Sequence, residues 1–180
     1  TTLEMVEGLR RPDGGTVSLL GTSPWPRDTS LLRRIGVQLQ ATAFIEHLTS
    51  IEQLRTVNDL YGVPATRAEE VLEQVGLIDA ADRDVDALSG GQRQRLSIAC
   101  ALVHRPEVLF LDEPSAGLDP IMAAGLDEMI MKLKKMLKTT FVIVTHELES
   151  IRLAADRVLM LDKGEVVFCG TLDEAMVSPV

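Results

Sequence analysis

Apolar and polar residues follow two different rhythms along the chain, and these divide it into three parts. Before residue 40 and after residue 105, short apolar runs that predict buried strands alternate with segments of helical apolar spacing. Between them, residues 49 to 104 show helical spacing and no strand-like run. Continuous apolar strands alternating with helices are typical of a parallel sheet covered on both faces. The pattern therefore predicts an α/β protein with a helical insert.

Capping residues and breakers set the expected element boundaries. We expect an N-terminal core remnant over 1–40, a helical subdomain over 41–104 and a C-terminal α/β core over 105–180. The predicted helices cover 3–9, 28–34, 49–61, 66–75, 79–83, 90–104, 121–138, 147–155 and 172–176. The predicted strands cover 16–20, 35–39, 108–111, 141–144, 157–161 and 165–169.

Composition narrows the classes of function. The net charge of −9 argues against a nucleic-acid partner held by a basic surface. No apolar run approaches the ~20 residues of a membrane-crossing helix, and the chain starts without a signal-peptide pattern. Any membrane role is therefore expected to come through a partner. Cys100 and Cys169 lack metal-ligand spacing and are expected to be buried thiols.

Polar clusters follow two of the predicted strands. Asp112 and Glu113 end the run 108–111, and Thr145 and His146 end the run 141–144. If the strands are parallel neighbours, both clusters lie at one edge of the sheet, where ligands of open α/β sheets bind. The Asp can hold Mg²⁺, the Glu can deprotonate a water and the His can contact a phosphate. These groups suit phosphoryl transfer to water.

A second cluster, Leu88-Ser89-Gly90-Gly91-Gln92, opens the helix predicted over 90–104. Two glycines at a helix N-terminus expose backbone N–H groups, let a ligand approach closely and favour an anion. Read alone, the same residues are equally compatible with an ordinary helix cap beside a flexible turn. The apolar helix that follows Gln92 favours the anion site.

These motifs together resemble the ATP-binding cassette family. Leu88–Gln92 matches its signature sequence, and Val108–Glu113 resembles its Walker B strand with the following glutamate. Ser115–Asp119 resembles its D-loop, His146 its switch histidine and Gln40 its Q-loop glutamine. All five occur in the order and at the spacing of the family, and the resemblance covers essentially the whole chain.

The resemblance implies a P-loop NTPase-like core that carries an inserted helical subdomain. It implies ATP as the bound nucleotide, with Asp112 supporting Mg²⁺ and Glu113 acting as general base or water-positioning residue. His146 contacts the γ-phosphate and holds the catalytic geometry. Gln40 contacts the metal and nucleotide and couples them to membrane-spanning subunits.

The resemblance also implies a head-to-tail dimer at the cytoplasmic face of the inner (plasma) membrane. In it, Ser89, Gly90, Gly91 and Gln92 contact ATP held by the other nucleotide-binding subunit, and Asp119 signals across the dimer. Residues 41–88 touch the membrane-spanning subunits.

The sequence departs from the family at its start. The phosphate-binding loop G-x-x-x-x-G-K-[ST] does not occur in it, so we expect a chain truncated before or within that motif. Thr1 resembles the end of the motif, as either its Mg²⁺-binding hydroxyl or the residue after it.

This departure predicts that the chain, as given, neither binds ATP tightly nor hydrolyses it. The lysine and the loop amides of that motif offset the charge of the β- and γ-phosphates. Calorimetric titration of the purified chain with MgATP checks the expectation, and a micromolar affinity would contradict it.

Three classes of cassette protein remain. The first is the ATP-hydrolysing subunit of a membrane transporter. The second, a soluble cassette acting on DNA or ribosomes, is disfavoured by the acidic charge and by the lack of coiled-coil heptads between Gln40 and Leu88. The third is a chain without ATPase activity that acts only as a binding or regulatory partner.

Two resemblances divide the chain within the transporter class. Residues 1–118 resemble cassettes of drug and polyketide efflux, whereas residues 113–180 resemble cassettes that drive phospholipid trafficking in outer-membrane asymmetry systems. Every lysine follows residue 120 and all but two arginines precede it. A mixed origin of the chain explains both the divided resemblance and the uneven distribution of lysine and arginine. Chance, together with a lysine cluster on one helix, explains the uneven distribution alone. Export of drug-like or lipidic substrates is the expected function.

Overall fold

The structure, a computed structural model, describes residues 2–39 and 43–177. Its helices are α1 (Thr2–Val6), α2 (Thr29–Leu32), α3 (Ser50–Tyr61), α4 (Thr66–Gln74), η1 (Ile78–Ala80), η2 (Val85–Ala87), α5 (Gly90–Leu102), α6 (Pro120–Met136), α7 (Leu148–Ala154) and α8 (Leu172–Val177). Its strands are β1 (Ile35–Gln38), β2 (Val108–Asp112), β3 (Thr140–Val144), β4 (Arg157–Asp162) and β5 (Glu165–Thr171).

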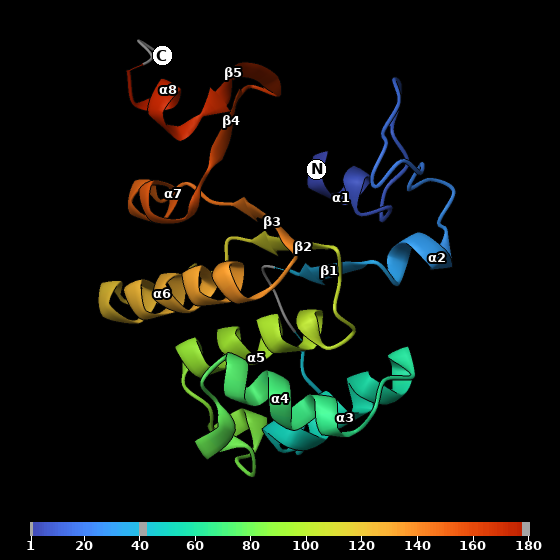
Figure 1. Ribbon diagram of the computed structural model, residues 1–180, viewed down its shortest axis with the longest axis vertical. Helices are drawn as coiled ribbons and strands as arrows, with labels where there is room; N and C mark the ends of the chain where they lie inside the picture. Colours follow the sequence, from blue (N-terminus) through green and yellow to red (C-terminus); the bar gives the residue numbers. More distant parts are fainter. Residues whose placement is uncertain (1, 40–42, 178–180) are drawn as a thin grey trace.

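Strands β1, β2 and β3 form a parallel sheet with β2 in the centre (Figure 1). In this register Gln38 lies opposite Leu111, and Asp112 lies opposite Val144. The carboxyl ends of all three strands therefore meet at one edge. The predicted α/β class and parallel sheet are confirmed.

Strand β2 is buried on both faces because its side chains alternate between two clusters. Leu109 and Leu111 belong to the larger cluster, which the helices α3 to α6 complete. Val108 and Phe110 belong to the smaller one, which includes Leu3 of α1 and Leu32 of α2. This alternation fixes which face of the sheet each helix covers.

The helices between β1 and β2 lie together on one side of the sheet, with α5 between the sheet and α3 and α4 (Figure 1). The predicted start of α3 is confirmed by a capping box, in which Thr49 and Glu52 bond to each other's backbone N–H groups. Gly62 ends α3 in the left-handed conformation. Subdomain boundaries at 40 and 104 remain a prediction.

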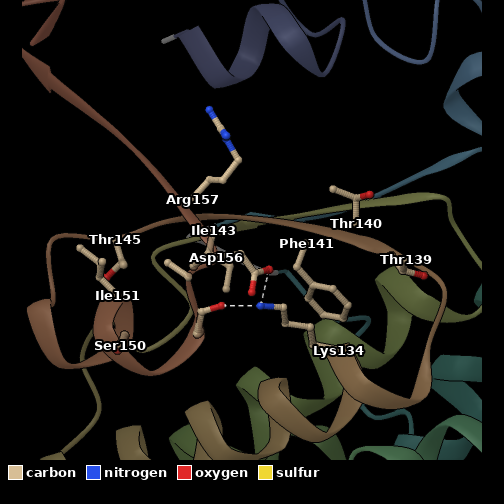
Figure 2. A pocket seen from close by; sticks show the side chains of 12 residues that line it. Lys134, Thr139, Thr140, Phe141, Ile143, Thr145, Ser150, Ile151, Asp156 and Arg157 are labelled. Atoms are coloured by element: carbon tan, nitrogen blue, oxygen red, sulfur yellow. Dashed lines mark hydrogen bonds and ion pairs between the residues drawn. The ribbon is translucent and has the colours of Figure 1, made fainter. Parts of the chain in front are cut away.

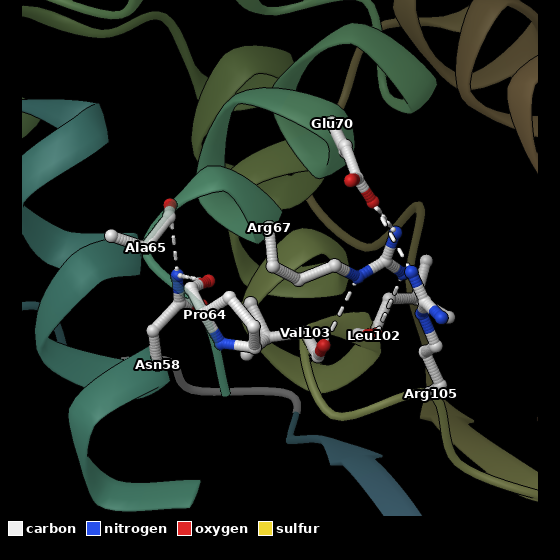
Figure 3. Close-up of polar contacts among 8 residues, drawn as sticks. All are labelled: Asn58, Pro64, Ala65, Arg67, Glu70, Leu102, Val103 and Arg105. Atoms are coloured by element: carbon white, nitrogen blue, oxygen red, sulfur yellow. Dashed lines mark hydrogen bonds and ion pairs between the residues drawn. The ribbon is translucent and has the colours of Figure 1, made fainter. Parts of the chain in front are cut away.

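A buried arginine ties α4 to the end of α5 (Figure 3). Nε and Nη2 of Arg67 donate to the carbonyl oxygens of Val103 and Leu102, at 3.1 and 3.3 Å. Nη1 of Arg67 pairs with Glu70 at 3.0 Å. Arg67 thus satisfies carbonyls that the end of a helix leaves without partners.

Replacing Arg67 with Met is expected to lower the free energy of unfolding by about 2 kcal/mol, because two buried carbonyls lose charged donors. Arg55→Met is the matched control: Arg55 pairs with Glu69 at an exposed site, where an ion pair contributes roughly 0.2–1 kcal/mol. Urea unfolding followed by circular dichroism measures both variants. Equal losses would contradict the assigned role of Arg67.

The C-terminal strands pair as an antiparallel hairpin, apart from the parallel sheet. Lys163 and Gly164, with φ of 48° and 85°, form its turn at the predicted position. Cys169, in β5, is exposed, which corrects the expectation of a buried thiol. Cys100 is partly buried, and desolvation raises its thiol pKa to about 12.

The strand expected over 16–20 does not form. Leu19 and Thr22 make an isolated bridge around a tight turn, and residues 16–18 have no ladder partner among the described residues. Leu19 and Leu20 instead pack on the smaller cluster. Their apolar character reflects this packing.

Strand β3 forms one edge of the parallel sheet, since within the described residues it pairs with β2 alone. Phe141 and Ile143 line a cavity of about 460 Å³ beside this strand (Figure 2). Lys134 crosses the floor of the cavity, where its Nζ pairs with Asp156 at 2.6 Å.

Among the described residues, no helix is long and apolar enough to cross a membrane.

Candidate functional site

Strand pairing brings the two predicted polar clusters together. The N–H of Glu113 donates to the carbonyl of Val144 at 2.9 Å, which extends the pairing of β2 and β3 by one step. One carboxylate oxygen of Glu113 lies 2.9 Å from Nδ1 of His146. Asp112 precedes Glu113 on β2, so a carboxylate pair and an imidazole share this edge of the sheet.

Glu113 adopts an unusual backbone conformation. Its φ of 46° lies in the left-handed region, which costs free energy for a residue with a Cβ. The side chain is 19% exposed, and its Oε2 is buried without a hydrogen-bond partner. A strained carboxylate with a free acceptor oxygen is suited to receive a donor such as water.

Burial and neighbouring carboxylates raise the pKa of Asp112. Burial contributes most to the shift, followed by the charges of Glu113 and Glu4. Glu7 is 2% exposed, and burial together with Asp112 and Glu4 raises its pKa to about 7. Carboxylates therefore cluster around the end of β2. Sequence reasoning missed Glu4 and Glu7, whose signal was two acids among the apolar positions of the first helix.

The carboxylate of Glu113 raises the pKa of His146, by its hydrogen bond first and by its charge second. The imidazole itself is 80% exposed. A raised histidine pKa stabilises the fold below the ordinary pKa, and this contribution is lost as the pH rises through the raised value. The pair is therefore weakest above the raised pKa of His146.

We expect NMR titration of the His146 ring to give a pKa above that of an ordinary histidine. In a Glu113→Gln variant the pKa should return towards the ordinary value, because the charge is gone. An unchanged His146 pKa in the variant would rule out the pair.

The predicted anion-binding cluster opens α5 as expected. Oγ of Ser89 accepts from the N–H of Gln92 at 3.3 Å, and the N–H of Ser89 donates to the Gln92 side chain at 3.0 Å. Gly90 lines a cavity of about 230 Å³ with Ala116 and Gly117. The helix N-terminus and the loop after β2 therefore share one small cavity.

Flexible side chains lie close to both glycines. A Cβ on Gly91 would lie 2.3 Å from Cε of Met122, and a Cβ on Gly90 would lie 3.3 Å from Leu118. Asp119 caps α6 by accepting from the N–H groups of Ile121 and Met122, both at 3.0 Å. This capping is the role of Asp119 that the structure shows, and signalling across a dimer remains a prediction.

The other predicted residues lie elsewhere. Thr1 and Gln40 fall outside the described residues. Asp112, Glu113 and His146 do not line the cavity at the start of α5, so the described residues place the predicted groups in two locations. Gln38, which sequence reasoning missed, is buried at the end of β1 with an unpaired Oε1, and its amide nitrogen lies 3.4 Å from Gln94 of α5.

The residues at the sheet edge suit a hard divalent cation. Asp112 and Glu113 are adjacent carboxylates, and the Oε2 of Glu113 lacks a partner among the described residues. Burial and negative neighbours raise the pKa of Asp112. Mg²⁺ prefers carboxylate oxygen and would offset this charge. The described residues thus fit the metal that the motifs imply.

Comparison with known proteins identifies the family of the chain. The profile of the ABC transporter family matches residues 1–116. The chain therefore belongs to the ABC transporter family. The parallel sheet with its covering helices is the feature of the fold that this membership accounts for.

Three relatives illustrate the breadth of the family. The linearmycin resistance ATP-binding protein LnrL of Bacillus subtilis is 33% identical over 95% of the chain and 56% of its own length. The daunorubicin/doxorubicin resistance ATP-binding protein DrrA of Streptomyces peucetius is 37% identical over 97% of the chain and 54% of its own length. The glycine betaine/carnitine/choline transport ATP-binding protein OpuCA of B. subtilis is 35% identical over 99% of the chain and 49% of its own length. The chain spans about half the length of these relatives.

Solved structures confirm the fold. CbiO1 from Clostridium perfringens, part of the ABC transporter complex CbiONQ, superposes with a TM-score of 0.88 at 26% identity, over 97% of the chain and 73% of CbiO1. The dimeric ATP-binding cassette MJ0796, bound to ADP and Pi, superposes with a TM-score of 0.81 at 28% identity, over 95% of the chain and 79% of MJ0796. The nucleotide-binding fold of the family is thus established for this chain.

Proposed function

We propose that the chain is the ATP-binding and ATP-hydrolysing part of an ABC transporter subunit. The observation that carries the proposal is the meeting of Asp112, Glu113 and His146 at the carboxyl edge of a parallel sheet. Glu113 is the proton acceptor for the attacking water, with its partnerless Oε2 free for that role. His146 holds the carboxylate and contacts the terminal phosphate.

Asp112 is the residue that would hold Mg²⁺, as the carboxylate-rich surroundings of the site favour. When bound, the metal neutralises charge on the transferred phosphoryl group. Gln40 is proposed as a second ligand on the basis of the family resemblance alone. The protein's own residues supply the base and its orientation.

We further propose that each ATP site forms between two copies of the chain or between the chain and a second nucleotide-binding subunit. Ser89, Gly90, Gly91 and Gln92 would contact the nucleotide of the other subunit, with Asp119 beside them. The start of α5 and Glu113 lie at two different locations in the chain's own structure, and this separation supports the arrangement. The dimeric state of MJ0796 with ADP and Pi supports it independently.

Mixing two inactive variants tests this proposal in a cassette that carries the phosphate-binding loop ahead of Thr1. Glu113→Gln disables the base, and Gly91→Glu places a negative charge and extra bulk where the nucleotide docks. Each homodimer carries one lesion in every site. A mixed dimer carries both lesions in one site and none in the other, so ATP hydrolysis should recover on mixing. Without recovery, sites shared between subunits are excluded.

The partners are proposed to be membrane-spanning transporter subunits, with the chain peripheral on the cytoplasmic face of the membrane. CbiO1, as part of the CbiONQ complex, supports this kind of assembly. We propose export of drug-like or lipidic substrates, which the two resistance proteins among the relatives favour. The phospholipid-trafficking resemblance of residues 113–180 stays a prediction. Reconstitution with the membrane subunits and assay of drug efflux from vesicles distinguishes export from uptake.

A further inference from the structure

Helix α7, which begins two residues after His146, has little apolar support. Every residue of α7 is described, and Ser150 is its one buried side chain. The cavity of about 460 Å³ lies between α7 and strand β3, with Ile151 of the helix and Phe141 of the strand among the residues that line it (Figure 2). Because the cavity takes the place of apolar contacts on this side, the placement of α7 depends on polar contacts.

Polar contacts with α6 hold α7 at both of its ends. In the first turn, Oγ of Ser150 donates to Oδ2 of Asp127 at 2.7 Å, and the two residues are 6% and 7% exposed. At the last turn, Nζ of Lys134 donates to the carbonyl oxygen of Ala154 at 2.8 Å (Figure 2). A short hydrogen bond to a carboxylate is among the stronger ones in a protein. The bond between Ser150 and Asp127 therefore places the start of α7 against α6.

The start of α7 in turn determines where His146 lies. Glu147 joins His146 to the helix, and its N–H donates to Oγ1 of Thr145 at 3.1 Å, a bond that spans His146. The Oε2 of Glu147 lies 3.4 Å from Oγ of Ser150. The imidazole itself is 80% exposed, so packing around the ring does not fix it. The flanking residues therefore hold the ring where it meets Glu113, at 2.9 Å.

We propose that Ser150 is a positioning residue for His146, because its hydrogen bond to Asp127 anchors α7 so that the imidazole reaches Glu113. The inference rests on the proposed function, in which His146 holds the carboxylate of Glu113 and contacts the terminal phosphate. Ser150 contacts neither the nucleotide nor the attacking water in this arrangement. It acts through the backbone, one helical turn away from His146.

The surroundings of Asp127 make the hydroxyl of Ser150 hard to replace. Burial raises the pKa of Asp127, the hydrogen bond from Ser150 lowers it, and the charge of Glu147 raises it. The hydroxyl thus lies between two carboxylates that repel each other. Removing it leaves this repulsion without compensation and leaves a buried carboxylate without its donor, which is unfavourable. The start of α7 is then expected to separate from α6.

NMR spectra of the purified chain test the placement of His146 without nucleotide. At one fixed pH, the ring resonances of His146 in Ser150→Ala should move towards their positions in Glu113→Gln, because both variants lose the contact between His146 and Glu113. Ser150→Thr keeps the hydroxyl, and its extra methyl group can enter the adjoining cavity, so it should keep the wild-type resonances. Unchanged His146 resonances in Ser150→Ala would overturn the inference.

Ser50→Ala is the matched control for the loss of a buried hydroxyl. Ser50 is the first residue of α3, is fully buried, and donates through Oγ to the carbonyl oxygen of Arg83 at 3.4 Å. Its replacement should leave the ring resonances of His146 at their wild-type positions. A shift as large as that in Ser150→Ala would show a general response to a lost hydroxyl and would contradict the role of Ser150.

Variants of Asp127 test the other partner of the hydrogen bond. Asp127→Asn keeps an acceptor oxygen for the hydroxyl of Ser150 and should retain the wild-type resonances of His146. Asp127→Leu removes the acceptor and should shift these resonances as Ser150→Ala does. Wild-type resonances in a folded Asp127→Leu protein would overturn the inference. If that variant does not fold, the comparison of Ser150→Ala with Ser150→Thr decides the question.

A double-mutant cycle tests the consequence for turnover in a cassette that carries the phosphate-binding loop. Ser150→Ala should lower kcat roughly tenfold to a hundredfold with little change in KM, because a misplaced His146 weakens interactions made in the transition state. In a His146→Ala background the same substitution should have no further effect.

An equal loss of turnover in both backgrounds would indicate a loss of folded protein and would overturn the inference. Ser150→Thr should restore kcat. A wild-type cassette without ATP hydrolysis would contradict the proposed function, whereas the NMR comparison of Ser150→Ala with Ser150→Thr uses no nucleotide and still decides how His146 is positioned.

Discussion

Replacing Glu113 with Gln is expected to reduce ATP hydrolysis by about 10²–10⁴-fold in a cassette that carries the phosphate-binding loop, while ATP binding is retained. Gln keeps the size of the side chain and loses the proton acceptor. The structure makes this residue the stronger candidate of the two carboxylates, because Glu113 contacts His146 and keeps an oxygen without a partner. Steady-state phosphate release and nucleotide-binding titrations measure the two effects separately.

Glu107→Gln is the matched control for this experiment. Glu107 immediately precedes the opposite end of β2 and pairs with Arg34 at an exposed site. Its replacement should leave turnover near wild type. If Glu113→Gln also kept turnover within a few-fold of wild type, Glu113 would not be the base.

Replacing Gly36 with Ala is expected to lower the free energy of unfolding by about 3 kcal/mol, at the upper end of overpacking costs. A Cβ at this position would lie 2.2 Å from the carbonyl oxygen of Ala101 and 2.9 Å from Leu109. The first neighbour is backbone of α5 and cannot rotate away. The substitution must therefore push α5 from strand β1.

Gly125→Ala provides the opposite expectation in the same protein. Gly125 lies inside α6, where a Cβ would have its nearest neighbour at 3.6 Å. Alanine favours helices over glycine by roughly 0.5–1 kcal/mol, so this variant should be slightly more stable. Thermal and urea unfolding of the two variants measure both signs. A Gly36→Ala protein as stable as wild type would show that α5 can move without cost.

Local rules predicted much of the fold. Thr49 with Glu52, and Gly62 thirteen residues after Thr49, bound a helix by capping chemistry that needs no distant partner. The run before Asp112 reads as a buried strand because both of its faces are apolar. The parallel sheet and the proximity of Glu113 to His146 were predicted from these local patterns, together with the order of the family's motifs along the chain.

Features that depend on distant packing escaped prediction. Residues 16–20 have the composition of a strand, yet a strand needs a partner, and the sequence does not state whether one lies alongside. Cys169 is exposed because β5 pairs only with β4, away from the parallel sheet. Burial raises the pKa of Glu7 most, and the charge of Asp112, more than a hundred residues away in sequence, raises it further. Charges that interact only after folding leave no local signal.

The edge position of β3 carries a hazard for the isolated chain. Its outer N–H and C=O groups are unpaired by any described strand, and Phe141 and Ile143 add partly buried apolar surface beside them. Such an edge is a template on which a strand from another molecule can add. Concentrated solutions of the chain should therefore form aggregates rich in β-structure. A short peptide that pairs with the free edge of β3 should reduce this aggregation.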